Sequence, residues 1–162
     1  MKKITFIILS LLFINTYAQE KKLWADSFIH KEAPEFIVEE WLTEEPDTAG
    51  KFILIDFWAT WCGPCKRAIP DLDTFHKEFS EDLVVIGISD EPKHKVESQK
   101  NPSIEYHSAI DTKKRLYKAF GVRAIPHCVI INPKGIVVWE GWPHLKGFKL
   151  TSEVIRDIVK AN

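Results

Sequence analysis

The residues whose types and spacing suggest chemistry most directly are Cys62 and Cys65, in the run WCGPCK at 61–66. Two cysteines separated by two residues can share one helical turn, so one sulfur can attack a partner's disulfide and the other can resolve the mixed disulfide. Cys62 is expected at a helix N-terminus, where unpaired N–H groups and the helix dipole favour a thiolate. Pro64 is compatible with that first turn. The spacing predicts thiol–disulfide exchange, with Cys62 as the nucleophile and Cys65 as the resolving thiol.

The same pair has two other interpretations, a buried structural disulfide and half of a zinc site. A zinc site built from cysteine pairs would need a second pair, and the chain has three cysteines in all. Three are also too few for a disulfide scaffold in an exported chain of this size. The cysteine count therefore favours redox activity.

A buried strand before the cysteines and an amphipathic helix after them must position the pair. Residues 52–58 form a nearly continuous apolar run, typical of a central strand covered on both faces, and Asp56 is its one charged residue. Apolar residues recur at helical spacing from residue 62 to residue 79, and Pro70 is expected to kink this helix. A strand followed by such a helix predicts a βαβ unit.

The rest of the chain continues to alternate between strand-like and helix-like segments, which indicates the α/β class with a largely parallel sheet. The pattern predicts a short edge strand or hairpin within 19–50, a strand at 83–89 and a hairpin of 128–131 with 136–139. It also predicts a helical segment within 90–100, a helix at 112–120 and a last helix at 152–160. Asp111 is expected to cap the helix at 112–120, and Gly121 to end it.

Three sequence features together resemble the thioredoxin fold family. They are the run at 56–66, which includes both cysteines of the pair, the helix proline Pro70, and the run GVRAIP at 121–126. The resemblance covers most of the chain and implies a thioredoxin-like fold, a central mixed sheet flanked by helices. Extra residues before the strand at 52–58 and an insertion at 90–110, before the helix that leads to Pro126, resemble the TlpA/ResA type of periplasmic protein. Some members of that type reduce apocytochrome c or other extracytoplasmic disulfides.

The resemblance implies an oxidoreductase that needs no cofactor beyond its own Cys62–Cys65 disulfide. Its expected partners are disulfide-bearing protein substrates and a membrane thiol electron donor of the DsbD or CcdA type. Gly63 and Pro64 resemble the residues of reducing thioredoxins more than those of the strongly oxidising DsbA type, so reduction is the expected direction. A disulfide-forming oxidase and a non-catalytic binding module are the alternatives.

Asp56 is a candidate base, because an unpaired carboxylate in an apolar strand should have a raised pKa. In the thioredoxins that this chain resembles, a buried aspartate at this position helps to deprotonate the resolving cysteine, which implies that role for Asp56 toward Cys65. The alternative is a carboxylate satisfied by a lysine or a water. The strand at 83–89 has no lysine, in contrast to the thioredoxin pattern.

The expected substrate-binding residues surround the cysteines. The resemblance implies a cis bond between Ile125 and Pro126, with Pro126 against the sulfurs and the Ile125 backbone able to pair with an extended substrate segment. An ordinary trans proline at the start of a strand is the alternative. Trp61 and Pro64 should shape the surface around the attacking sulfur, and Gly63 should leave room for a partner chain.

His127 and Cys128 raise a metal hypothesis, because thiolates and imidazole bind copper(I) or zinc and exported thioredoxin-fold copper chaperones exist. Those chaperones have CxxxC spacing, whereas this chain has CxxC, and Cys128 lies in a strand that looks buried. A packed core thiol and no metal site are therefore predicted. A peroxidase of the peroxiredoxin type is disfavoured because the proline and threonine spacing that cradles a peroxide is missing before Cys62.

The first 18 residues are typical of a secretory signal, with Lys2 and Lys3 before an apolar stretch at 4–14 and cleavage expected after Ala18. The apolar stretch is shorter than the ~20 residues of a membrane span. Residues 19–162 are then one domain, exported to the periplasm and not membrane-spanning. The net charge of −1 becomes −3 without the two leader lysines, so a nucleic-acid partner is not expected.

Overall fold

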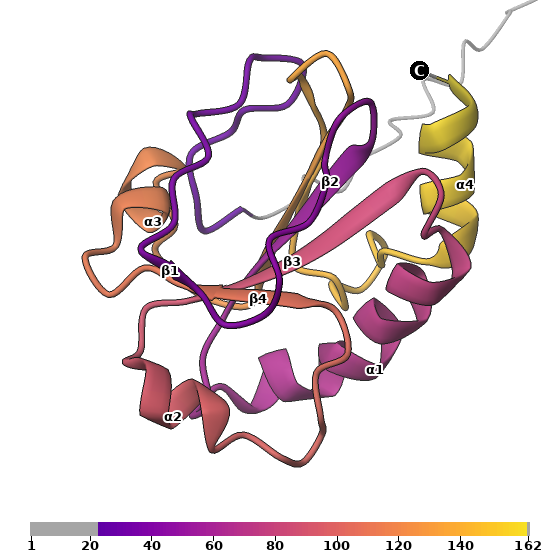
Figure 1. Cartoon of the computed structure of the whole chain (residues 1–162). Helices are drawn as coiled ribbons and strands as arrows, with labels where there is room; N and C mark the ends of the chain where they lie inside the picture. Colours follow the sequence, from indigo (N-terminus) through magenta and orange to yellow (C-terminus); the bar gives the residue numbers. More distant parts are fainter. Residues whose placement is uncertain (1–22, 162) are drawn as a thin grey trace, which may run out of the picture.

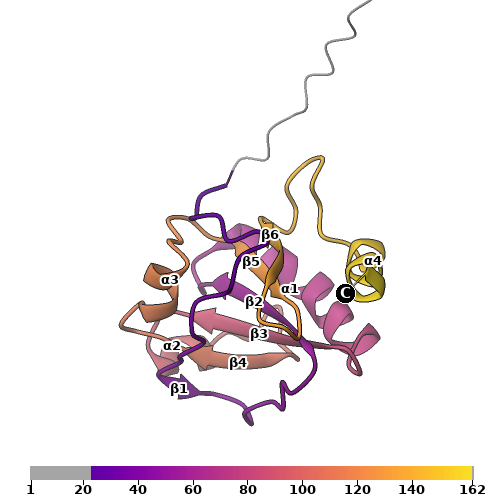
Figure 2. The same cartoon turned by 90° about the horizontal axis from the view of Figure 1, so that it is seen from above.

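The computed structural model describes residues 23–161, so the predicted signal peptide lies outside the described residues. A six-stranded sheet in the order β1-β4-β3-β2-β5-β6 forms the centre of the molecule, with helices on both sides of it (Figures 1 and 2). The elements are β1 Glu40–Trp41, β2 Phe52–Trp58, α1 Gly63–Glu78, β3 Leu83–Ser89, α2 Lys93–Glu97, β4 His107–Ile110, α3 Arg115–Ala119, β5 His127–Ile131, β6 Val137–Gly141 and α4 Ser152–Ala161. Within residues 23–161, no helix has the length and apolar character that crossing a membrane requires.

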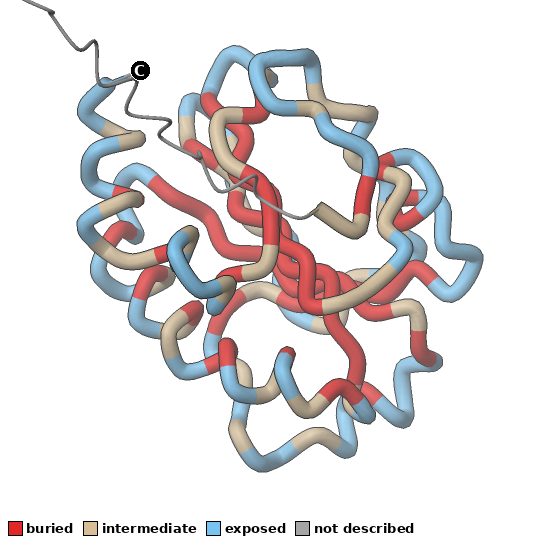
Figure 3. Tube along the Cα trace, turned by 180° about the vertical axis from the view of Figure 1, so that it is seen from behind, coloured by how far each residue is buried: buried red, intermediate tan, exposed pale blue. Residues whose placement is uncertain are grey.

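The sheet is mixed, as the thioredoxin resemblance implied. The largely parallel sheet expected from the strand–helix alternation is wrong, because three of the five strand pairings within residues 23–161 are antiparallel. β2, β3 and β4 run parallel to one another, while β5 pairs antiparallel with β2 and with β6, and β1 pairs antiparallel with β4. The apolar runs of β2 and β3 lie in the middle of the sheet, and Figure 3 shows these strands as the buried centre of the molecule. Continuous apolar sequence thus corresponds to strands covered on both faces.

The two faces of the sheet pack against different elements, and strand alternation decides which residues point to which face. Leu54 of β2 packs in a cluster with Leu72 of α1 and Ile155 of α4. Phe57 of β2 packs in a second cluster with Leu116 of α3, and part of the N-terminal segment covers this side. Figure 1 shows α1 and α4 together on one side of the sheet. By alternation with Leu54, Asp56 lies on the face that α1 covers.

The predicted helix at 112–120 is wrong at its start, because α3 begins at Arg115. Lys114 has a left-handed backbone conformation, φ 57°, and its N–H donates to the Asp111 carbonyl, so residues 111–114 form a turn. The Asp111 carboxylate instead accepts from the Leu116 N–H at 2.8 Å, inside the helix. Gly121, with φ 59°, follows α3 as predicted.

The segment 90–110, expected as an insertion, also supplies a strand of the central sheet. Its helix, α2, is limited to Lys93–Glu97, and residues 107–110 form β4, a strand of the main sheet between β3 and β1. The sequence pattern did not predict this strand because it has only four residues and lies next to a polar stretch. The predicted edge strand within 19–50 is confirmed as β1, at the edge of the sheet beside β4.

Candidate active site

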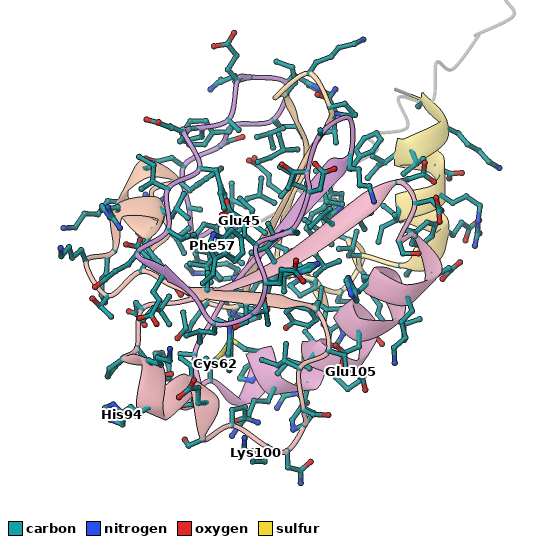
Figure 4. All side chains as sticks on the ribbon, in the orientation of Figure 1. Glu45, Phe57, Cys62, His94, Lys100 and Glu105 are labelled. Atoms are coloured by element: carbon teal, nitrogen blue, oxygen red, sulfur yellow. A yellow bond between two sulfur atoms is a disulfide. The ribbon has the colours of Figure 1, made fainter. Side chains whose placement is uncertain are left out.

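Cys62 and Cys65 form a disulfide at the N-terminus of α1, directly after the end of β2 (Figure 4). Cys62 is the N-cap residue, and the Cys65 N–H donates to its Sγ at 3.2 Å. Cys65 is fully buried, and Cys62 is 3% exposed. When the pair is reduced, the helix N-terminus and this N–H favour the thiolate of Cys62. The division into an attacking Cys62 and a resolving Cys65 stays a prediction.

The turn that delivers Cys62 to the helix is held by a buried carboxylate, which the sequence reasoning missed. Glu91, in the loop after β3, is 7% exposed and accepts from the Thr60 N–H at 2.6 Å and from the Thr60 hydroxyl at 3.0 Å. The Cys62 N–H donates to the Ala59 carbonyl at 3.0 Å. β2 and β3 are parallel neighbours, so the loops that follow them meet at one edge of the sheet. The order of the two predicted strands could therefore have indicated that Glu91 lies near the cysteine turn.

A groove opens next to Trp61, the residue before Cys62, and neither cysteine is among the residues that line it. Trp61 is 70% exposed and lines a cavity of about 570 Å³ together with Val122 and Ile125. Lys114, Lys118, Arg123 and Asp90 also line this cavity, so three cationic side chains and one carboxylate surround its apolar floor.

The predicted substrate-binding residues fall around this groove or at the start of α1. The Ile125–Pro126 bond is cis, and Ile125 packs against the apolar cluster that contains both cysteines. Pro126 is buried at the start of β5, while Pro64 is exposed and Gly63 half-buried in the first turn of α1. The accessible residues beside the buried cysteines are therefore Trp61, Gly63 and Pro64, and a substrate-binding role for them stays a prediction.

Asp56 is fully buried, and burial raises its pKa to about 7. Two donors oppose that shift: the Cys128 thiol lies 3.5 Å from Oδ1, and the Tyr106 hydroxyl lies 3.2 Å from Oδ2. The residue opposite Asp56 on β3 is Gly87, where a lysine is absent as the sequence indicated. A carboxyl group with a pKa near 7 is suited to accept and return a proton at neutral pH.

Cys128 is a free and fully buried thiol, as the prediction of a packed core cysteine required. Burial and the neighbouring Asp56 raise its pKa well above the usual range. The hydrogen bond to Asp56 is an addition that the sequence did not indicate. His127 is also buried, with its ring 6.1 Å from that of Phe57. In the part of the chain that the structure describes, no three histidine, cysteine or acidic side chains are grouped to hold a metal ion.

Comparison with known proteins agrees with this geometry. Residues 29–140 match the family model described as the AhpC/TSA family. The thiol-disulfide oxidoreductase ResA of Bacillus subtilis is 28% identical over 113 residues, which cover 66% of this chain and 63% of that protein. ResA of Bacillus cereus is 28% identical over 155 residues, which cover 92% of this chain and 84% of the relative.

A solved structure of a thioredoxin-like protein in its oxidised form superposes with a TM-score of 0.66 at 22% identity, covering 81% of this chain and 96% of the other. At that identity the likeness shows the fold alone, and the fold is thioredoxin-like, as the resemblance implied.

Proposed function

We propose that this chain, which belongs to the AhpC/TSA family, is an exported thiol–disulfide oxidoreductase that reduces disulfides in extracytoplasmic proteins. The observation that carries the proposal is the Cys62–Cys65 disulfide at the N-terminus of α1, beside exposed Trp61 and an open groove. The relatives named thiol-disulfide oxidoreductase ResA support the same activity.

In the first step, the Cys62 thiolate of the reduced protein attacks one sulfur of a substrate disulfide. The substrate S–S bond breaks, a mixed disulfide forms between Cys62 and that sulfur, and the other substrate sulfur leaves as a thiolate that takes up a proton. The helix N-terminus and the Cys65 N–H stabilise the attacking thiolate. The substrate segment lies against the Ile125 backbone and Trp61.

In the second step, Asp56 accepts the proton of the Cys65 thiol, and the Cys65 sulfur attacks the Cys62 sulfur. The mixed disulfide breaks, and the second substrate sulfur leaves as a thiolate that takes up the proton released from Asp56. Two electrons have then passed from the cysteine pair to the substrate, with one proton from Cys65 and one from solvent, and the Cys62–Cys65 disulfide has formed. The burial of Cys65 and Asp56 keeps bulk water away from this proton transfer.

Each cycle leaves the disulfide oxidised, so two electrons must return from a reductant. In an oxidising periplasm, a membrane thiol donor of the DsbD or CcdA type supplies them. The leader at 1–18 supports export with cleavage after Ala18, which leaves 19–162 as one domain. Substrates of this exported enzyme include apocytochrome c in the setting of cytochrome c maturation. The site uses no further cofactor.

Reduction of insulin, measured as turbidity when the released B chain precipitates, tests the activity. The purified domain with dithiothreitol as reductant should accelerate precipitation, and Cys62→Ser should abolish the acceleration. Cys128→Ser is the matched control, because its hydroxyl keeps a hydrogen-bond donor beside Asp56 while it removes the third thiol of the chain, which takes no part in exchange. Equal rates with wild type and Cys62→Ser would refute the proposal.

Substrate trapping extends the test to the natural partners. Cys65→Ala leaves the nucleophile but cannot resolve the mixed disulfide, so it should hold substrates covalently on Cys62. Mass spectrometry after reduction should then identify exported proteins that contain disulfides or paired cysteines. Recovery of the same proteins with the Cys62→Ser, Cys65→Ala double variant would show that the capture does not use this site.

A further inference from the structure

We infer that Tyr106 and Cys128 are positioning residues for Asp56, each donating a hydrogen bond to one of its carboxylate oxygens, and that Gly87 makes the space through which Tyr106 reaches it. The inference rests on the proposed exchange at Cys62 and Cys65, in which Asp56 handles the proton of Cys65. It gives a role to three residues outside the cysteine motif, which come from β3, from β5 and from the loop before β4.

The two donors hold the carboxylate from two sides. The Tyr106 hydroxyl lies 3.2 Å from Oδ2, and the Cys128 sulfur lies 3.5 Å from Oδ1. Cys128 is the antiparallel partner of Asp56 on β5, so sheet register places its thiol there. Tyr106 precedes β4, and both residues are essentially inaccessible to solvent. Since each oxygen has its own donor, the orientation of the carboxylate is fixed toward the α1 side of the sheet.

Gly87 explains why a tyrosine can occupy this position. It is the parallel partner of Asp56 on β3, and a Cβ there would lie 2.9 Å from Tyr106 Cε2 and 3.1 Å from Trp58 Nε1. Any side chain at this position would therefore displace the Tyr106 ring. The strand that lacks the lysine of the thioredoxin pattern thus carries a glycine, and the segment 90–110 supplies a neutral donor in the place of that cation.

The titratable groups around Asp56 are few. β5 presents Cys128, and the segment before β4 presents Tyr106. α1 carries Cys65, which is held in the disulfide, and Asp73, whose charge acts on Tyr106. Tyr117, of α3, feels the charge of Asp56, but its hydroxyl donates to the carbonyl groups of Trp58 and Ile88.

The two donors therefore influence the pKa with which Asp56 acts as a base. Burial raises the pKa of Asp56 to about 7, and the two hydrogen bonds, which favour the charged carboxylate, keep that pKa from rising further. Loss of either donor should therefore raise the pH above which Asp56 is deprotonated and can accept the proton of Cys65. A purely structural role for Tyr106 or Cys128 would alter stability without moving this titration.

The test follows the carboxyl carbon of Asp56 by NMR through a pH titration of the oxidised domain labelled with ¹³C-aspartate. Tyr106→Phe keeps the ring and removes the hydroxyl, and should move the Asp56 midpoint upward by about one pH unit. Cys128→Ala should move it in the same direction by a smaller amount, because a thiol is the weaker donor. The acidic limb of the insulin-reduction profile should shift upward in parallel.

Tyr117→Phe is the matched control, since it also removes a buried tyrosine hydroxyl but none that contacts Asp56; the Asp56 midpoint should stay where it is in wild type. Gly87→Ala should reproduce the upward shift of Tyr106→Phe if it folds, and the Tyr106→Phe result does not depend on it.

An unchanged midpoint in both Tyr106→Phe and Cys128→Ala, or an equal shift in Tyr117→Phe, would overturn the inference. The NMR midpoint needs no activity, so a wild type inactive on insulin would refute the proposed function without deciding this point.

Discussion

At the scale of single residues, the burial of Asp56 has two effects. It raises the pKa of the carboxyl group, which makes Asp56 a suitable base, and it lowers the stability of the folded protein when the carboxyl group is charged. In the unfolded chain its pKa returns to the ordinary value near 4, whereas in the folded protein it is about 7. Between these values the folded state binds a proton that the unfolded state has released. Folding stability must therefore fall as pH rises through this window, and stay level above it.

This dependence predicts the behaviour of Asp56→Asn. The variant should lose the decline in unfolding free energy between pH 4 and pH 7, to which Asp56 contributes on the order of 4 kcal/mol. At pH 8 it should consequently be more stable than wild type. Urea unfolding of the oxidised domain at several pH values measures both effects, with Asp82→Asn, an exposed aspartate before β3, as the control. Parallel stability curves for wild type and Asp56→Asn would contradict the assignment.

The sequence was sufficient to find residues that break a local pattern, and insufficient for residues whose partners are distant. Asp56 was predicted because it is a charge in an apolar strand, and Cys62 because of its spacing from Cys65. Glu91 and Tyr106 were missed because their function depends on contacts with Thr60 and Asp56, 31 and 50 residues away. No periodicity in the sequence reports such contacts.

At the scale of elements, the loop from α3 to β5 places Ile125 against the apolar cluster that contains both cysteines. Gly121 begins this loop with φ 59°, and a Cβ there would lie 2.4 Å from Asp26 Cγ and 2.9 Å from its Cβ. Asp26 forms an ion pair with Arg123 at 2.7 Å, and its N–H donates to the Phe120 carbonyl at 3.2 Å. These contacts join the N-terminal segment to the loop that forms the groove.

Gly121→Ala should be more damaging than a glycine replacement of the same conformation elsewhere. Gly135, with φ 79°, has open space where a Cβ would lie, so Gly135→Ala adds backbone strain alone, about 1 kcal/mol. Gly121→Ala adds the clash with Asp26 and should cost about 3 kcal/mol. Urea unfolding midpoints compare the two variants, and equal losses of stability would show that the contact with Asp26 does not constrain the loop.

The elements that sequence patterns predicted well are long and strongly periodic, such as β2, β3 and α1. The start of α3 was wrong by three residues because Lys114 adopts a left-handed conformation, which is uncommon for a residue with a side chain. β4 has four residues, and its pairing with β3 and β1 is nonlocal. Short elements defined by their neighbours lie beyond the information in local spacing.

At the scale of the whole molecule, charge is distributed unevenly. The chain carries a net charge of −1, yet Lys114, Lys118 and Arg123 surround the groove. Lys114 is paired with Asp90 at 2.7 Å, and Arg123 with Asp26 at 2.7 Å. With these two cations paired, Lys118 supplies the further positive charge at the groove, and it should favour substrate segments that carry acidic residues next to their disulfide.

Lys118→Glu tests this preference. For a disulfide peptide with acidic flanking residues, kcat/KM should fall by roughly fivefold at low salt, and the difference should shrink at high salt. A peptide with basic flanking residues should show the opposite change. Lys160→Glu, on α4 and away from the groove, introduces the same charge and should leave both rates near wild type. An identical effect of the two variants would indicate a response to net charge rather than to the groove.

The central claim is that the Cys62–Cys65 pair acts as a reductant, and its reduction potential tests that claim most directly. The purified domain is equilibrated with buffers of defined ratio of reduced to oxidised dithiothreitol or glutathione, and the fraction of free Cys62 and Cys65 thiols is measured by alkylation and mass spectrometry. The account predicts a reduction potential of about −270 mV, in the range of thioredoxin. A potential of about −120 mV would make the protein an oxidant and would contradict the claim.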